Sequence, residues 1–238
     1  MTPVIDGEVH HFQELGLYDG MVLLGDKETK SYWHHITGES LYGPLAGKKI
    51  PVQNIFHTTV EEALENHPDI HVAISDARMR ENVGVLGRLR RGLDKMFRNI
   101  RGDDRWREFA ATMGKADTRR DDMEIGLGIW AGDEARYYPY DEVRASGNVI
   151  FDTFAGRRMV VFYAPDALAL LAVHADATSA TWEGDELHLN TGQVIRWGIL
   201  YEPDGTRSET DRPMQVFTRW YGFYLTWPKT EVYERSGV

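Results

Sequence analysis

Short runs of apolar and β-branched residues, separated by polar turn residues, recur along most of this chain. In the first half, Met21 to Leu24, Ser31 to Ile36 and Ile70 to Ile74 have this character, and polar residues 25–30 predict a turn between the first two. Further strands are predicted at Met159 to Tyr163, Leu168 to His174, Glu186 to Leu189 and Val194 to Tyr201. The pattern therefore indicates a mostly β protein.

Helical signals are fewer. Thr59 and Glu62 have the spacing of a capping box, which predicts a short helix from Val60 to Asn66. Pro68 cannot continue that helix, because it lacks a backbone N–H and clashes with the preceding turn.

A second helical region separates the two strand-rich parts. Residues 83–101 place leucines at helical spacing among arginines, and another helix is expected at 105–113. We name residues 78–116 the basic connector. Two interpretations stay open: it binds an anionic membrane or partner, or it docks on its own acidic protein with its charges in solvent.

An internal repeat adds organisation to these elements. Pro51-Val52-Gln53 leads through the predicted helix to His67-Pro68-Asp69, and Pro213-Met214-Gln215 leads through aromatic residues to Trp227-Pro228-Lys229. Two copies of one supersecondary unit would explain this echo, and chance similarity is the alternative. We therefore expect an α+β, mostly β fold with two related halves, residues 1–77 and 117–238, joined by a helical connector at 78–116.

Composition narrows the functional classes. The 238 residues carry a formal net charge of −10, which disfavours nucleic acid as a partner. The absence of cysteine excludes disulfides and thiolate metal sites. No apolar run is long enough to span a membrane, and residues 1–12 lack the apolar core of a signal peptide, so a soluble protein of unassigned compartment is expected.

Several ordered motifs carry a family resemblance. Residues 26–33 read D-K-E-T-K-S-Y-W, residues 38–47 read G-E-S-L-Y-G-P-L-A-G, and residues 135–139 read A-R-Y-Y-P, with Asp152 following. In these segments the chain resembles the DUF3179 family, whose biochemical role is not established. Many members carry a cysteine-containing segment, in some with selenocysteine, upstream of the part that matches residues 15–18. Thiol chemistry is therefore not carried over to this cysteine-free chain.

Histidines are the most concentrated candidate ligands. They crowd the first half, and imidazole is a common ligand for copper, zinc or iron. Adjacent strand residues point to opposite faces, so a pair such as His34-His35 should give one ligand to a site, and His35 is preferred. The candidate metal ligands are His35, His34, His57 and His11. Surface or hydrogen-bonded histidines without a metal are the alternative.

These observations lead to two functional hypotheses. The first is a metal- or small-ligand-dependent enzyme, oxidoreductase-like, with its site between the halves. Trp33 would contact the cofactor, and Arg136 and Asp152 would be catalytic. The second is a non-catalytic binding or assembly module, a homo-oligomer among its forms, that uses the basic connector and an aromatic C-terminal surface. That surface would hold Phe217, Trp220, Tyr224 and Trp227, which equally fit a core stripe.

Overall fold

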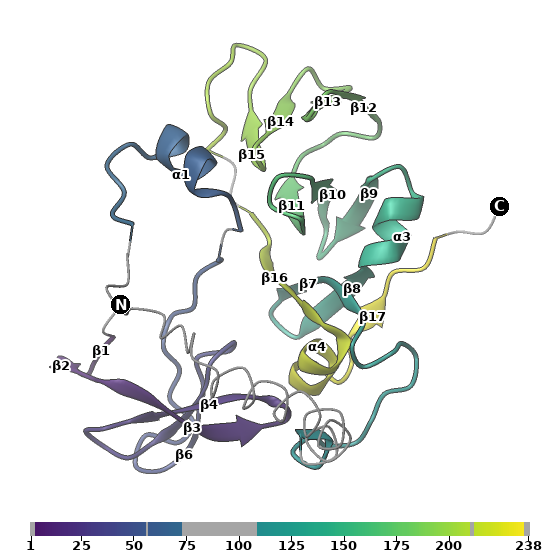
Figure 1. Cartoon of the computed structure of the whole chain (residues 1–238). Helices are drawn as coiled ribbons and strands as arrows, with labels where there is room; N and C mark the ends of the chain where they lie inside the picture. The colour runs from purple at the N-terminus through teal and green to yellow at the C-terminus, as the bar shows by residue number, and fades with distance from the viewer. Residues whose placement is uncertain (1–2, 56, 73–108, 210–211, 236–238) are drawn as a thin grey trace, which may run out of the picture.

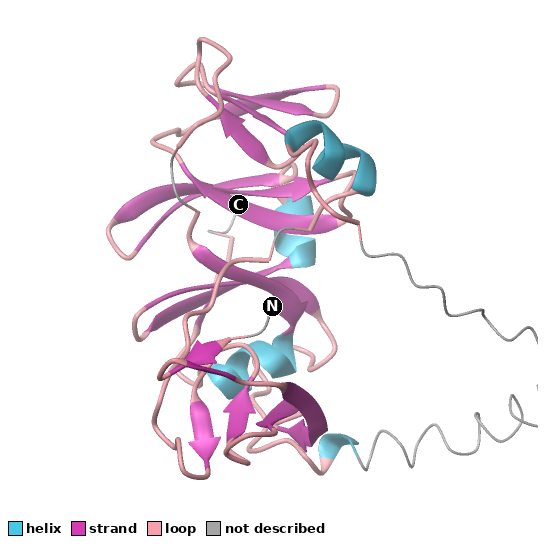
Figure 2. Cartoon of the chain, turned by 90° about the vertical axis from the view of Figure 1, so that its left-hand side faces the viewer, coloured by secondary structure: helices cyan, strands magenta, loops and turns pink. Residues whose placement is uncertain are grey.

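Sheets of three or four strands lie one above another in this computed structural model, which describes residues 3–55, 57–72, 109–209 and 212–235 (Figures 1 and 2). The N-terminal sheet contains β3 (Phe12–Tyr18), β4 (Met21–Asp26), β5 (Tyr32–His34) and β6 (Ser40–Tyr42), in that order. A short ribbon of β1 (Val4–Ile5) and β2 (Glu8–Val9) precedes it.

The second half forms the other three sheets. The central sheet has the order β16 (Met214–Arg219), β7 (Ile125–Ala131), β8 (Glu134–Pro139), β17 (Glu231–Val232), with β17 parallel to β8. The three-stranded sheet has the order β11 (Ala169–His174), β10 (Arg157–Ala164), β9 (Val149–Phe154). The distal sheet runs β12 (Ala180–Glu183), β13 (Glu186–Leu189), β14 (Val194–Arg196), β15 (Ile199–Tyr201).

Strand β10 shows how the sequence builds this stack. Met159 and Val161 are fully buried against the central sheet, while Val160 and Phe162 on the opposite face are buried against the distal sheet. Successive side chains of a strand point to opposite faces, so a strand covered on both faces must be a continuous apolar run. Fully burying one such side chain stabilises the fold by about 1.5–3 kcal/mol.

Among the described residues, three short helices cover or connect the sheets: α1 (Val60–Asn66), α3 (Tyr140–Ala145) and α4 (Trp220–Thr226), and residues 109–110 are helical as well. Helix α4 packs its buried Trp220 and Phe223 on the face of the central sheet that is turned toward the N-terminal sheet (Figure 1). A Cβ on Gly128 of β7 would lie 2.0 Å from the Phe223 ring, so only glycine permits this close packing. The aromatic C-terminal residues therefore include a core stripe.

A side-chain amide joins the central sheet to its neighbour. Gln215 of β16 accepts the Ala172 N–H at 2.8 Å and donates to the Ala172 carbonyl at 2.9 Å. Asn54 supports the same strand, because it accepts the Gln215 backbone N–H and donates to the Pro213 carbonyl, each at 2.9 Å. These contacts tie the segment before α1 to the second half.

The structure confirms an α+β, mostly β fold and the helix at Val60–Asn66, including its capping box. The predicted strand from Val194 to Tyr201 is wrong in one respect, because Trp197 and Gly198 have φ angles of 49° and 70° and turn the chain between β14 and β15. None of the described helices is long and apolar enough to cross a membrane.

The two-halves arrangement is not confirmed. Helices α1 and α4 each have seven residues, and each is followed by a turn that contains a proline. The two turns have equivalent hydrogen bonds: the Ile70 N–H donates to the His67 carbonyl, and the Thr230 N–H donates to the Trp227 carbonyl. The flanks differ, because residues 51–55 and 70–72 form no strand where the second copy has β16 and β17. Most of the basic connector, at 78–108, lies outside the described residues.

Candidate functional site

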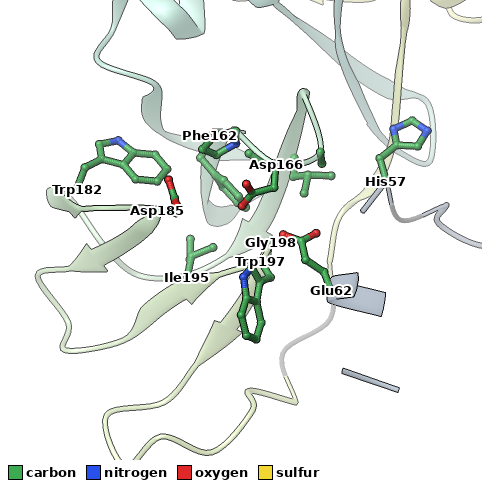
Figure 3. A pocket seen from close by; sticks show the side chains of 13 residues that line it. His57, Glu62, Phe162, Asp166, Trp182, Asp185, Ile195, Trp197 and Gly198 are labelled. Atoms are coloured by element: carbon green, nitrogen blue, oxygen red, sulfur yellow. The ribbon is translucent and has the colours of Figure 1, made fainter. Parts of the chain in front are cut away.

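A narrow pocket lies between α1 and the loops of the three-stranded and distal sheets (Figure 3). Its floor and walls are largely apolar and aromatic, and a few polar groups converge in it, which is typical of a small-ligand site. The lining residues are His57, Glu62, Phe162, Ala164, Pro165, Asp166, Ala167, Leu171, Trp182, Asp185, Ile195, Trp197 and Gly198.

Glu62 reaches the pocket because the N-terminus of α1 fixes it. The Thr59 hydroxyl accepts the Glu62 backbone N–H at 3.2 Å, and the Glu62 carboxylate accepts the Thr59 backbone N–H at 3.2 Å and the Thr58 hydroxyl. Only 6% of Glu62 is exposed. The same capping box that starts the helix therefore presents an acidic side chain to the pocket.

Asp166 meets Glu62 from the other side. It lies in the turn between β10 and β11, where the Leu168 N–H donates to the Pro165 carbonyl at 3.2 Å. Burial, followed by the charges of Glu62 and Asp185 and a hydrogen bond with Glu62, raises the pKa of the Asp166 carboxyl. Asp166 is itself exposed, so its carboxyl group and that of Glu62 form a pair of neighbouring acids at the edge of the pocket, which we call the acid pair.

Two indole rings line the pocket, with Trp182 of β12 next to Asp185 and Trp197, in the turn before β15, nearer to Glu62 (Figure 3). The indole N–H of Trp182 donates to the Gly147 carbonyl at 3.2 Å, which fixes that ring. A left-handed conformation costs a side-chain-bearing residue about 1–2 kcal/mol, so the surrounding contacts must hold Trp197. Arg212 contributes by donating to the Gly198 carbonyl.

Arg136 and Asp152, the predicted catalytic pair, lie together but outside this pocket. Arg136 donates to Asp152 at 2.7 Å and to Glu231 at 2.9 and 2.6 Å, while the Tyr138 hydroxyl donates to Asp152 at 2.7 Å. Burial alone would lower the pKa of Arg136, but the hydrogen bonds to Glu231 and Asp152 outweigh it and raise that pKa. This network joins β8 to β9 and β17.

Trp33, the predicted cofactor contact, is 1% exposed and donates its indole N–H to Asp26 at 2.9 Å. The rings of His34 and His35 are stacked, with centroids 5.9 Å apart. The expectation that these two point to opposite faces is wrong, because β5 ends at His34 and the chain then turns, with the Gly38 N–H donating to the His34 carbonyl.

Burial disfavours the protonated form of both imidazoles. Burial, followed by the charge of His35, lowers the pKa of His34 to about 4. Burial also lowers the pKa of His35, although the hydrogen bond from its Nδ1–H to the Val22 carbonyl opposes the change. His34 Nδ1 already accepts the Thr37 N–H at 3.2 Å, so His35 has the freer ring nitrogen.

The remaining candidate metal ligands lie elsewhere. His11 is exposed and donates through Nδ1 to Glu28 at 2.7 Å. His57 lines the pocket and meets the Phe217 ring edge-on. Among the described residues, the four candidate histidines therefore occupy three separate places: the turn after β5, the Glu28 contact and the pocket.

Sequence reasoning missed most of the pocket. Glu62 was recognised only as a helix cap, and Asp166, Asp185, Trp182 and Trp197 gave no signal of shared function. The turn signals at 183–185 and after 164 could have marked Asp185 and Asp166 as exposed acids, but not as neighbours of α1.

Comparison with known proteins gives a family and no closer relative. No curated protein and no solved structure matches the chain. Residues 2–229 match the sequence family described as "Protein of unknown function (DUF3179)", and the motifs in the N-terminal sheet and around Arg136 fall inside that range. This chain belongs to the DUF3179 family.

Proposed function

We propose that this protein binds a small organic cation through its ammonium group in the pocket of Glu62 and Asp166. We further propose that the acid pair exchanges a proton with the bound ligand. The observation that carries the proposal is that Glu62 of α1 and Asp166 of the β10–β11 turn line one pocket together with Trp182 and Trp197. This proposal develops the first hypothesis from the sequence, a small-ligand-dependent enzyme whose site lies between residues 1–77 and residues 117–238.

The chemistry of the walls supports a cationic ligand. Carboxylates attract an ammonium group, and the face of a tryptophan ring attracts it through the ring quadrupole, by about 0.5–2 kcal/mol. Asp185 and Glu61 add negative charge near Asp166, which favours a cation and disfavours an anion. The pocket is narrow, so an ammonium head group fits better than a bulky ring system.

Proton exchange follows from the raised pKa of Asp166. A bound cation stabilises the ionised form of Asp166, so its pKa should fall on binding and the pair should release a proton. Binding should therefore strengthen as the pH rises through the pKa of Asp166 in the free protein. The other titratable groups that line the pocket are Glu62, Asp185 and His57. An acid whose pKa responds to its ligand in this way is suited to general acid–base catalysis.

Calorimetric titration of the full chain with propylammonium tests this proposal, with propanol and propionate as the uncharged and anionic comparisons. We expect the protein to bind propylammonium but neither propanol nor propionate. The Kd should be on the order of millimolar because the ligand has only a few heavy atoms. Titrations in two buffers of different ionisation enthalpy should reveal the released proton.

The matched variants are Asp166→Asn and Asp133→Asn, since Asp133 lies at the exposed tip of the β7–β8 hairpin. Asp166→Asn should weaken propylammonium binding at least about tenfold and abolish proton release, while Asp133→Asn should leave both unchanged. Equal affinities in the two variants, or equal binding of propanol, would overturn the proposal. The oxidoreductase-like activity and the catalytic roles of Arg136 and Asp152 remain predictions from the sequence.

A further inference from the structure

A buried histidine nitrogen near the N-terminal sheet lacks a hydrogen-bond partner. His10 lies between β2 and β3 and is 2% exposed, and its Nδ1 has no partner among the described residues. Leaving a buried polar nitrogen unpaired costs about 1–3 kcal/mol. An unpaired buried group of this kind needs an explanation, and a bound ion is one of the few available.

Two carboxylates lie beside that nitrogen. His10 Nδ1 is 3.4 Å from an oxygen of Asp26, and one carboxylate oxygen of Glu28 completes a set whose atoms all lie within 4.8 Å of one another. An N–H···O hydrogen bond normally measures about 2.7–3.2 Å between heavy atoms, so the 3.4 Å separation is long for one. Two ligands bound tetrahedrally at about 2.1 Å would be about 3.4 Å apart.

Other residues hold both carboxylates in place. The Trp33 indole donates to Asp26 at 2.9 Å, and Thr29 donates to Asp26 through its backbone N–H at 2.5 Å and its hydroxyl at 2.7 and 2.9 Å. Glu28 accepts the His11 backbone N–H at 2.8 Å and the His11 ring at 2.7 Å. Metal ligands are commonly oriented by such partners, which fix the ligand oxygen before the ion arrives.

We propose that His10 Nδ1, Asp26 and Glu28 bind one divalent transition-metal ion of the zinc type. One imidazole nitrogen and two carboxylate oxygens are within the ligand set of Zn²⁺, and water would complete the coordination. Metal binding would then explain four residues of the D-K-E-T-K-S-Y-W motif. Asp26 and Glu28 are ligands, and Thr29 and Trp33 position Asp26.

This site is independent of the pocket. His10, Asp26 and Glu28 are all on or beside the N-terminal sheet, and none of them lines the cavity of Glu62 and Asp166. Loss of metal binding would therefore leave the binding of an organic cation untouched, and failure of the cation proposal would leave the metal site untouched.

Cobalt provides a direct readout. The full chain, first treated with a chelator and then freed of it, is titrated with Co²⁺ while visible absorption is recorded, and Zn²⁺ is then added in competition. We expect one equivalent of Co²⁺ to give the intense visible bands of a tetrahedral site, and one equivalent of Zn²⁺ to remove them. Absence of these bands, or weak binding of several equivalents, would show adventitious binding only and would overturn the proposal.

Three variants locate the ion. His10→Gln should weaken metal binding about 10- to 100-fold. Glu28→Gln should do the same, and its partly exposed side chain, 28% accessible, makes it the safer test of the site should His10→Gln fold poorly. His188→Gln is the matched control, because His188 lies 3.3 Å from Glu186 and 3.7 Å from Glu183 but is more exposed. If His188→Gln weakens binding and Glu28→Gln does not, the ion is elsewhere.

Discussion

The side chain of Gln215 acts as the hydrogen-bonding partner of a backbone unit on another sheet, and Gln215→Met tests what that contact contributes. Gln215 is 6% exposed and Ala172 is fully buried. Methionine has nearly the same length and volume as glutamine, so the change opens little space. It removes the two hydrogen bonds to Ala172 and a longer one, at 3.3 Å, to the Pro213 carbonyl, which keeps its bond from Asn54. Water has little access to the Ala172 N–H and carbonyl left behind.

The expected loss follows from these two groups. Each buried polar group without a partner costs about 1–3 kcal/mol, and the apolar methionine side chain offsets part of that total. We expect Gln215→Met to lower the free energy of unfolding by about 2–4 kcal/mol. This is a large part of the roughly 5–15 kcal/mol that holds a typical domain together.

Urea unfolding followed by tryptophan fluorescence measures the loss, since Trp130 and Trp220 belong to the cluster that packs on the central sheet. The matched control is Gln13→Met on the exposed strand β3, which should change stability by less than about 0.5 kcal/mol. A loss below about 1 kcal/mol for Gln215→Met, with unchanged dependence on urea, would refute the reasoning. Ala172 would then have found other partners.

Two further predictions concern packing and pH. Gly128→Ala should destabilise by about 1–3 kcal/mol or more, because the new Cβ would lie 2.0 Å from the Phe223 ring; Gly114→Ala, with its nearest atom at 3.3 Å, is the control for the same unfolding measurement. His34 has a folded pKa of about 4 and an unfolded pKa near its ordinary 6.5, so its contribution to stability should be full above pH 6.5 and fall as the pH drops toward 4. In unfolding experiments at several pH values, His34→Gln should make the free energy of unfolding less dependent on pH, whereas His67→Gln, at an exposed position, should not. If stability changes with pH equally in His34→Gln and in the original chain, the low pKa of His34 is contradicted.

Local signals in the sequence predicted the elements whose causes are local. Helix α1 begins where Thr59 and Glu62 satisfy each other's backbone groups, and both residues lie within one turn. From Met159 to Ala164, strand β10 is a continuous run of buried, mostly apolar residues, because both of its faces are covered there. The turn at Trp197 could not be predicted in this way, since nothing local favours a left-handed tryptophan and the distal sheet imposes it.

The candidate sites could not be predicted from the sequence, because their residues come together only in the folded chain. Glu62 and Asp166 are more than a hundred residues apart in the sequence, and only the packing of α1 against the β10–β11 turn brings them together. Similarly, His10 and His11 lie in the link between β2 and β3, where no strand alternation applies, so the sequence does not say which of them faces Asp26. The family motif marked Trp33, while its buried bond to Asp26 depends on the hairpin between β4 and β5.

The strand order of the central sheet has a consequence for synthesis of the protein. Strand β7 pairs with β16 through contacts such as Trp130 with Met214, while the three-stranded and distal sheets are encoded between them. During synthesis, β7 and β8 therefore leave the ribosome long before β16 and β17 are made. Until then, the Phe223 ring cannot cover Gly128. The face of this hairpin that α4 covers should therefore stay open until residues 214–232 are made, which leaves an apolar surface exposed late in synthesis.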